Sequence, residues 1–280
     1  MKIDTEKSTV IFEAERVSFA YNNHQVALQD ASLTVRAGER LAILGTNGCG
    51  KSTLLKILDG LYFPTSGTLR AFGEPMTEEV LLDGARAYAF RRRVGLVFQD
   101  PDVQLFSPTV WDEVTFAPLH LGLPHPEVIE RAEWAMSLLD IQKLRDRVPH
   151  RLSGGEKKKV ALASVLSLRP EVWLLDEPTA SLDPRSQSRL LDFIWELERE
   201  GNTVITATND LAILEEVADR VIIFSEDHQI VGEGSPQEVL SNYELLAKCN
   251  LIHEHRHKHG EIEHEHPHAH RYTHEHKHEK

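Results

Sequence analysis

The chain has 280 residues, of which 41% are hydrophobic and 27% are charged, a composition that is ordinary for a globular protein with a sizeable core. The formal net charge of −13 argues against non-specific nucleic-acid binding, which needs a basic surface. The sequence contains no run of the roughly 20 apolar residues that span a bilayer and no apolar secretory signal at its start. The two cysteines, Cys49 and Cys249, predict no disulfide framework and fit a reducing cytoplasm.

Short apolar runs alternate with helical stretches from residue 1 to about residue 250. The runs are compact, end at turn-forming or charged residues, and are typical of strands buried on both faces of a mostly parallel sheet. Their alternation with helices predicts an α/β fold. The predicted strands cover residues 40–45, 94–98, 172–176, 203–208 and 220–224, and the predicted helices cover residues 51–61, 154–168 and 184–200.

Two segments depart from this alternation. Between about residues 105 and 150 the strand signals stop and prolines punctuate a helical region, which predicts a helical subdomain inserted into the α/β body. Residues 251–280 hold 11 of the 16 histidines, mostly alternating with Glu, Lys or Arg, and almost no apolar residue. A segment of this composition cannot form a core, so we predict a disordered tail.

Residues 45–52, GTNGCGKS, match the pattern GxxxxGK[ST] between a predicted buried strand and a predicted helix. In this context the pattern predicts a phosphate-binding loop rather than a plain glycine-rich turn. Glycines let backbone N–H groups face phosphate oxygens, and the start of a helix adds partial positive charge. Lys51 is expected to reach the β- and γ-phosphates, the Ser52 hydroxyl to ligate Mg²⁺, and Cys49 to fill a slot for a small residue. The residues expected to contact nucleotide here are Gly45, Thr46, Asn47, Gly48, Cys49, Gly50, Lys51, Ser52 and Thr53.

Residues 172–177, VWLLDE, supply an acidic pair. A buried strand that ends in Asp176 places a carboxylate at the carboxyl edge of the sheet, where ligands bind in open α/β sheets. Asp176 is expected to hold Mg²⁺, directly or through water, and Glu177 to act as a general base on the attacking water. Such a pair alone is commonly a solvated strand end, but the phosphate loop favours the functional interpretation.

Residues 152–156, LSGGE, open a predicted helix about 100 residues after the phosphate loop and about 20 residues before Asp176. In this order and spacing they resemble the signature motif of the ATP-binding-cassette (ABC) family, and the resemblance covers essentially all of residues 10–248. It implies a P-loop nucleotide-binding domain with a mostly parallel sheet, an antiparallel β part and an inserted helical subdomain, with ATP and Mg²⁺ as cofactors. It also implies a second anion-binding helix start at Ser153, Gly154, Gly155 and Glu156.

The family resemblance implies further roles along the chain. Tyr21 in VSFAYNN resembles the aromatic residue that stacks on adenine, with a plain strand-surface aromatic as the alternative. Gln99 resembles the residue that senses Mg²⁺ and the attacking water, residues 181–183 resemble the loop that communicates across the dimer, and residues 232–240 resemble the usual end of such domains. Where the family has a histidine that contacts the γ-phosphate, this chain has Asn209, whose amide can donate a hydrogen bond but cannot become a cation. We therefore expect an ATPase that binds ATP and hydrolyses it slowly.

The resemblance also implies partners. In this family the signature motif of one chain completes the nucleotide site of another, so we expect a homodimer with two equivalent sites, or a heterodimer with a related chain. Residues 98–106, FQDPDVQLF, resemble the version found in energy-coupling-factor importers of vitamins, cobalt or nickel. This implies a peripheral protein on the cytoplasmic face of the cell membrane, bound to integral permease subunits. The candidates for a groove that receives a permease helix are Val103, Leu105, Phe106, Val110 and Trp111, although for each one singly plain packing is favoured.

The histidines of the tail suggest the cargo. Neutral imidazole suits Ni²⁺, Co²⁺, Cu²⁺ and Zn²⁺, and alternating histidines predict many loose sites. Together with the motif above, the tail resembles the cobalt/nickel branch of these importers, with a merely solubilising tail as the alternative. A vitamin importer, a soluble ABC ATPase without a transporter and a metal-storage protein are the other functions that remain open. The candidate Ni²⁺ or Co²⁺ ligands are His253, His255, His257, His259, His264, His266, His268, His270, His274, His276 and His278.

Overall fold

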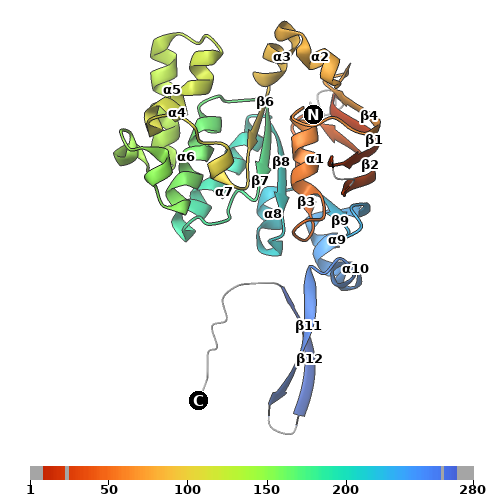
Figure 1. Ribbon diagram of the computed structural model, residues 1–280. Helices are drawn as coiled ribbons and strands as arrows, with labels where there is room; N and C mark the ends of the chain where they lie inside the picture. Colours follow the sequence, from red (N-terminus) through yellow and green to blue (C-terminus); the bar gives the residue numbers. More distant parts are fainter. Residues whose placement is uncertain (1–8, 23–24, 260–261, 270–280) are drawn as a thin grey trace, which may run out of the picture.

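A six-stranded sheet forms the centre of the domain (Figure 1). The structure, a computed structural model, describes residues 9–22, 25–259 and 262–269. In spatial order the strands are β10 (Ile230–Gly234), β9 (Arg220–Phe224), β3 (Arg40–Leu44), β8 (Thr203–Thr208), β7 (Val172–Asp176) and β6 (Val94–Val97). Neighbouring strands are parallel except for β10, which runs antiparallel to β9. All five predicted strands are confirmed, and they lie in this one sheet.

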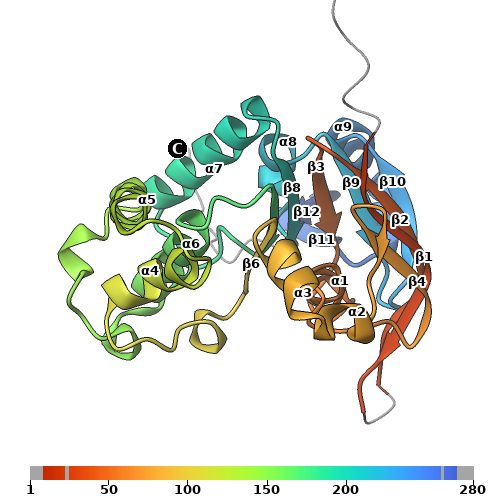
Figure 2. The same ribbon diagram turned by 90° about the horizontal axis from the view of Figure 1, so that it is seen from above.

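A second sheet is antiparallel and stands to one side of the first, opposite the helices of the other side (Figure 2). Its strands, in spatial order, are β2 (Val26–Arg36), β1 (Val10–Ala20), β4 (Ser66–Ala71) and β5 (Glu74–Pro75). The expected α/β fold with a mostly parallel sheet and an antiparallel part is therefore confirmed.

Strand β3 shows why the central strands are continuously apolar. All five of its residues are buried. Leu41 and Ile43 belong to the apolar cluster shared with the antiparallel sheet, whereas Ala42 and Leu44 belong to the cluster shared with the helical layer. Successive side chains of a strand point to opposite faces, so both faces need apolar residues where both are covered. The carboxyl ends of β3, β7 and β8 consequently meet at one edge of a sheet with a core on either side.

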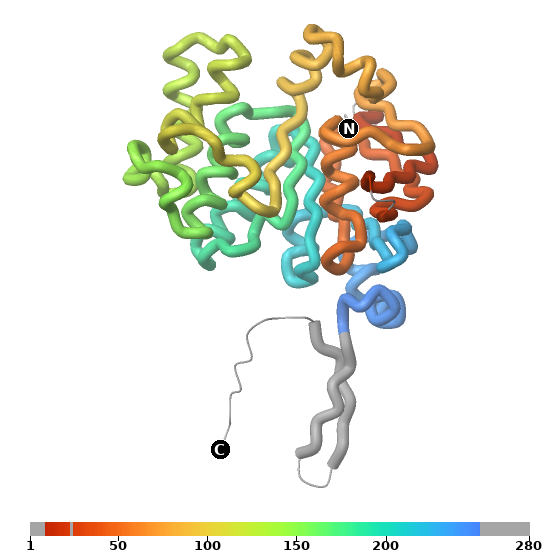
Figure 3. The backbone as a smooth tube through the Cα atoms, viewed as in Figure 1, coloured from red at the N-terminus to blue at the C-terminus, as the bar shows by residue number. Residues whose placement is uncertain are grey.

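The helices fill the space on both sides of the central sheet. Helix α1 (Lys51–Leu58) follows β3 and packs in the cluster shared with the antiparallel sheet. The chain enters the helical layer after β6 and returns to the sheet at β7 (Figure 3), which confirms the predicted helical subdomain. This layer contains η1 (Pro101–Val103), α4 (Val110–His120), α5 (His125–Leu138), η2 (Gln142–Leu144), η3 (Pro149–Arg151) and α6 (Gly154–Leu166). The other helices are α2 (Glu78–Leu82), α3 (Gly84–Arg91), α7 (Pro184–Arg199), η4 (Leu211–Ile213), α8 (Leu214–Val217), α9 (Pro236–Ser241) and α10 (Tyr243–Lys248).

The histidine-rich tail differs from the expectation of disorder. Strands β11 (Ile252–His259) and β12 (Ile262–Ala269) pair as an antiparallel hairpin, which corrects that expectation for these residues. Alternation of histidine with charged residues has the two-residue period of a strand. The register also places Arg256 opposite Glu265 and Lys258 opposite Glu263. Residues 270–280 lie outside the described part of the chain.

No helix among the described residues is long and apolar enough to cross a bilayer.

Candidate functional site

The loop between β3 and α1 is held in a phosphate-binding shape by its own lysine. Lys51 Nζ donates to the carbonyl oxygens of Gly45 at 2.7 Å and Thr46 at 3.1 Å. Gly50, at the N-cap of α1, has a φ of 116°, and a Cβ there would collide with the Ala27 carbonyl oxygen. Both the backbone angle and the close approach therefore require glycine at this position.

A cavity of about 440 Å³ opens in front of this loop. Ten of the predicted site residues line it, from four separate regions of the sequence. They are Tyr21, Asn47, Gly48, Gly50, Lys51, Ser52, Thr53, Gln99, Asp176 and Glu177, joined by Gln25, Val26, Ala27 and His228. The pattern-based prediction of one site formed by the loop and the acidic strand end is thus consistent with the geometry.

Gly45 and Thr46, two residues of the loop that were predicted to contact nucleotide, accept hydrogen bonds from Lys51 at their carbonyl oxygens. Cys49 is 2% exposed, and a Cβ on Gly45 would collide with its Sγ atom. Burial raises the pKa of the Cys49 thiol, so this sulfur is a packing group with little thiolate character. The structure places it in the small slot that the sequence predicts.

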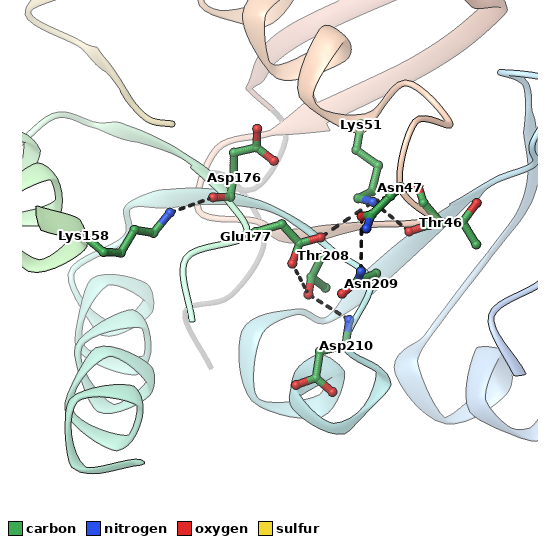
Figure 4. Close-up of polar contacts among 10 residues, drawn as sticks. Thr46, Asn47, Lys51, Lys158, Asp176, Glu177, Thr208, Asn209 and Asp210 are labelled. Carbon is green, nitrogen blue, oxygen red and sulfur yellow. Dashed lines mark hydrogen bonds and ion pairs between the residues drawn. The ribbon is translucent and has the colours of Figure 1, made fainter. Parts of the chain in front are cut away.

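Asp176 and Glu177 lie at the carboxyl end of β7, beside Lys51 (Figure 4). Lys51 Nζ is 3.6 Å from Glu177 Oε1, and the Thr208 hydroxyl donates to Glu177 Oε2 at 3.3 Å. Burial raises the pKa of Glu177, while Lys51 opposes that rise. Glu177 also has a φ of 44°, in the left-handed region that disfavours side chains. A buried, oriented carboxylate whose pKa is moved toward neutrality has the properties of a general base.

The residues around Asp176 fit a magnesium ion. Asp176 Oδ1 is buried and has no hydrogen-bond partner among the described residues, which leaves a carboxylate oxygen available to an ion or to its bound water. Burial raises the pKa of Asp176, and a hydrogen bond with the Ser52 side chain opposes that rise. Hydroxyl and carboxylate oxygens are the ligands that Mg²⁺ prefers.

Tyr21 also lines the cavity and directly follows β1. Its hydroxyl is 3.0 Å from Thr53 Oγ1, and its ring meets Phe19 and Tyr62 edge-on at centroid distances of 5.2 and 5.8 Å. These contacts fix the ring at the cavity wall, where it can take a base. His228 was not predicted; its Nδ1 lies 3.2 Å from the Cys49 carbonyl oxygen, beside the phosphate loop.

Asn209, which stands where the family has histidine, is exposed at the rim of the site. Its Nδ2 atom donates to Asn47 Oδ1 at 3.3 Å (Figure 4). Asn47 belongs to the phosphate loop and lines the cavity. The amide of Asn209 is therefore near the loop as expected, in a long neutral hydrogen bond.

The signature segment lies outside this cavity. Ser153 caps α6: its hydroxyl accepts from the Glu156 N–H, while Glu156 Oε2 accepts from the Ser153 N–H at 3.0 Å and from its hydroxyl at 2.8 Å. Glu156 was predicted to contact nucleotide, and the structure instead engages its carboxylate in this cap, which lowers its pKa. Gly154 has open space where a Cβ would stand, and a Cβ on Gly155 would approach the Ser181 carbonyl oxygen at 3.0 Å. Ser153 and Gly154, at the start of α6, are thus exposed to solvent.

Lys158 of α6 connects this helix with the carboxyl ends of β6 and β7, and pattern reasoning missed it. The side chain is 1% exposed, and Nζ donates to the carbonyl oxygens of Phe98, Gln99 and Asp176 at 2.9, 3.2 and 3.2 Å. Burial lowers the pKa of Lys158 to about 8. Lys159, also on α6, donates from Nζ to Asp183 Oδ2 at 2.8 Å. Asp183 belongs to the loop that is predicted to communicate across a dimer.

A second cavity, of about 370 Å³, lies between the segment after α1, the end of α3, β6, α4 and α6 and has mostly apolar walls. Of the five residues predicted for a groove, Phe106 lines it and is 61% exposed. Leu105 and Val110 are buried in the core, Trp111 packs half-buried against that core, and Val103 is exposed outside the cavity. Packing between the subdomains thus accounts for Leu105, Val110 and Trp111. Residues that the prediction missed, including Leu61, Phe98 and Phe116, complete the walls.

For the candidate metal ligands of the tail, the structure describes only the position of the backbone. His253, His255, His257 and His259 lie in β11, and His264, His266 and His268 lie in β12. His270, His274, His276 and His278 lie outside the described residues.

Comparisons with known proteins agree with the geometry. A family model described as ABC transporter matches residues 28–180. The nickel import ATP-binding protein NikO of Rhodobacter capsulatus is 47% identical over 247 residues, which cover 87% of this chain and 96% of that protein. The solved structure of CbiO1 from Clostridium perfringens, described as part of the ABC transporter complex CbiONQ, has 36% identity and a TM-score of 0.69 and covers 87% of this chain and 96% of its own. The dimeric, post-hydrolysis structure of the ATP-binding cassette MJ0796 with ADP and phosphate has 25% identity and a TM-score of 0.73, covering 81% of this chain and 99% of its own.

Proposed function

Because this chain belongs to the ABC transporter family of ATP-binding proteins, we propose that it is the ATP-hydrolysing subunit of a multi-subunit membrane importer. The observation that carries the proposal is the separation of two half-sites on one chain. Lys51, Asp176 and Glu177 share one cavity, whereas the helix start at Ser153 is exposed outside it. A second copy of the chain, placed by a two-fold axis, can supply the missing helix start to each cavity.

The proposed hydrolysis uses the residues of the cavity in distinct roles. The N–H groups of the loop and Lys51 bind the β- and γ-phosphates, and Tyr21 stacks on the base. Ser52 and Asp176 would hold Mg²⁺, which neutralises phosphate charge when it is bound. Glu177 orients the attacking water and accepts its proton, because it is the buried carboxylate with a raised pKa that Lys51 and Thr208 hold in place.

The role of Glu177 is tested by Glu177→Gln, which keeps the size of the side chain and a partner for Thr208. We expect ATP binding to persist and hydrolysis to fall at least about a hundredfold, the usual contribution of a general base. Glu196→Gln changes an exposed carboxylate of α7 and serves as the matched control. Undiminished hydrolysis in the Glu177 variant would exclude this residue as the base.

The apolar cavity around Phe106 is proposed as the docking site for a short apolar helix of an integral permease subunit. CbiO1, to which this chain is similar, is described as part of a transporter complex. Phe106 and Leu61 are 61% and 43% exposed although both are large apolar side chains, and such exposure on a concave surface marks interaction sites. The protein would then lie peripherally at the cytoplasmic face of the membrane, as a homodimer or as a heterodimer with a related chain.

Two variants of neighbouring apolar residues test this docking site. Phe106→Ser removes a wall of the cavity, whereas Val103→Ser changes a side chain that is 68% exposed but lies outside it. We expect the first to lose co-purification with the permease and the second to keep it, with ATP hydrolysis by the free subunit unchanged in both. Equal retention of both variants would place the permease elsewhere.

Nickel or cobalt is the proposed cargo, and the tail is proposed to bind these ions. The relative NikO is named a nickel import ATP-binding protein, and alternating imidazoles suit both metals. Leu251 and Ile252 are buried, so truncation after Ile252 removes the tail without opening the core. Calorimetry should show Ni²⁺ or Co²⁺ uptake by the full chain near neutral pH, its loss in the truncated chain, and release as imidazoles protonate near a pKa of about 6.5. Equal uptake by both chains would leave the tail without this role, and vitamin uptake by the assembled transporter would favour the alternative cargo.

A further inference from the structure

A third cavity, of about 700 Å³, lies away from the nucleotide site, where the end of α3, the turn between α4 and α5 and the turn between α6 and β7 meet. Helices α3 and α5 stand at the same end of the molecule (Figure 1). Four arginines line this cavity: Arg92, Arg93, Arg131 and Arg169. It is also the largest of the three cavities described here, and nothing in the proposed ATPase cycle uses it.

The arginines outnumber the carboxylates in this cavity. Arg131 pairs with Glu127 at 2.6 Å and Arg93 pairs with Glu171 at 2.8 Å, so both lining carboxylates are neutralised. Four arginines and two glutamates leave a net charge of +2 on the walls, in a chain whose net charge is −13. A concave surface concentrates such a local field, so the cavity attracts anions against the overall charge of the protein.

The two remaining guanidinium groups, those of Arg92 and Arg169, have no acidic partner among the described residues. Each lies over an aromatic ring instead: Arg92 is 5.7 Å from the centroid of Tyr88, and Arg169 is 4.8 Å from that of Trp134. Stacking of this kind fixes the plane of a guanidinium and leaves its edge N–H groups free to donate. Both arginines are solvent-exposed and hence accessible.

Two further features show that the arginine arrangement is constrained. Arg169 has a φ of 52°, in the left-handed region that glycine or asparagine would occupy more easily. Arg131 is fixed by its bond to the Leu168 carbonyl oxygen at 2.9 Å as well as by Glu127, yet its Nε atom is buried without an acceptor. The backbone of Arg169 and the two bonds of Arg131 therefore limit where these guanidinium groups can lie.

We propose that this cavity binds a phosphate group through Arg92 and Arg169, with Arg93 and Arg131 as the fixed positive wall. Guanidinium groups match phosphate oxygens in two-point hydrogen bonds, which makes arginine the preferred residue for phosphate recognition. The phosphate can belong to the headgroup of an anionic phospholipid or to a soluble anion. The cavity shares Leu121 and Leu168 with the apolar cavity around Phe106, so its ligand would sit beside the surface that we propose to face the permease.

Paired variants separate this site from general charge effects. Arg92→Gln combined with Arg169→Gln removes the two unpaired cations of the cavity. Arg36→Gln combined with Arg199→Gln removes two exposed cations of β2 and α7 that do not line it. Both double variants change the net charge equally. Thermal unfolding and ATP hydrolysis are measured separately for each variant to verify that it is folded.

Two binding measurements on the full chain distinguish the sources of phosphate. Co-sedimentation compares vesicles of phosphatidylcholine with vesicles that also contain phosphatidylglycerol, and equilibrium dialysis measures labelled inorganic phosphate while a non-hydrolysable ATP analogue with Mg²⁺ fills the nucleotide site. We expect one of the two ligands to bind the wild type and the surface control, and the cavity variant to lose at least about tenfold in affinity, since each basic residue at an anionic surface contributes about a factor of five. Binding of vesicles identifies a lipid headgroup, and binding of phosphate identifies a soluble anion. Equal losses in the two double variants, or no binding of either ligand by the wild type, would overturn the proposal.

Discussion

Replacement of Asn209 by histidine should accelerate ATP hydrolysis. Asn209 Nδ2 makes a neutral hydrogen bond of 3.3 Å with the loop residue Asn47, and Asn209 is exposed, so an imidazole fits without displacing the core. A neutral hydrogen bond contributes about 0.5–1.5 kcal/mol, whereas one from a charged donor contributes about 1.5–3 kcal/mol. A gain of about 1 kcal/mol that develops with charge on the γ-phosphate corresponds to roughly a fivefold increase in kcat.

The pH dependence of this gain identifies its cause. An imidazole with an unperturbed pKa of about 6.5 is mostly charged at pH 6 and mostly neutral at pH 8. The ratio of kcat for Asn209→His to kcat for the wild type should therefore be larger at pH 6 than at pH 8, because titrations common to both proteins cancel in the ratio.

Steady-state hydrolysis at saturating ATP and Mg²⁺ measures this ratio across the pH range. Asn209→Gln keeps an amide and should show no pH-dependent gain, which makes it the matched control. A histidine variant that is no faster than the wild type at any pH would refute the argument that the missing cation limits turnover.

Two other predictions concern buried charges. Lys158→Met should lower kcat by about tenfold or more, because the Lys158 side chain donates hydrogen bonds to three carbonyl oxygens at the strand ends. The Kd for ATP should stay unchanged, because Lys158 does not line the nucleotide cavity. An equal loss of ATP binding would contradict a positioning role for Lys158. Asp59 pairs with Arg91 at 2.8 Å, and burial raises the pKa of Asp59 from 3.8 to about 7. The folded state therefore binds the proton of Asp59 more tightly than the unfolded state does. Acidification from pH 8 to pH 5 should stabilise the fold through this group by about 2.5 kcal/mol. Urea unfolding should show that Asp59→Asn removes this part of the pH dependence, and identical pH profiles of wild type and variant would exclude the shift.

Sequence patterns predicted the parts of the site that depend on local chemistry. The loop around Lys51 and the strand end at Asp176 are recognisable because glycines, a lysine and carboxylates must occupy fixed positions along a strand–loop–helix segment. The central strands were recognisable for the same reason, since a sheet covered on both faces needs continuous apolar runs.

Residues whose role depends on packing between distant segments were harder to predict. Leu105 and Phe106 are neighbours of similar hydrophobicity, yet one is 3% exposed and the other 61%, because only the helices packed around them decide which is covered. Residues 157–159 are three consecutive lysines that the sequence does not distinguish. On α6 they point in different directions: Lys157 contacts Asp102, Lys158 contacts the carbonyl oxygens at the strand ends, and Lys159 contacts Asp183. Lys158 could have been found, since it lies on the apolar face of that helix at i, i+4 spacing from the buried Leu162.

Two copies of the chain are expected to enclose ATP, with the helix start of each facing the loop of the other, and the mass of the particle in solution measures this association. Glu177→Gln should retain ATP, so the variant can be weighed by light scattering with Mg²⁺ and excess ATP, and again with ADP. We expect dimers with ATP and monomers with ADP. Persistent monomers with ATP, both for the isolated chain and for the chain assembled with its permease, would contradict it.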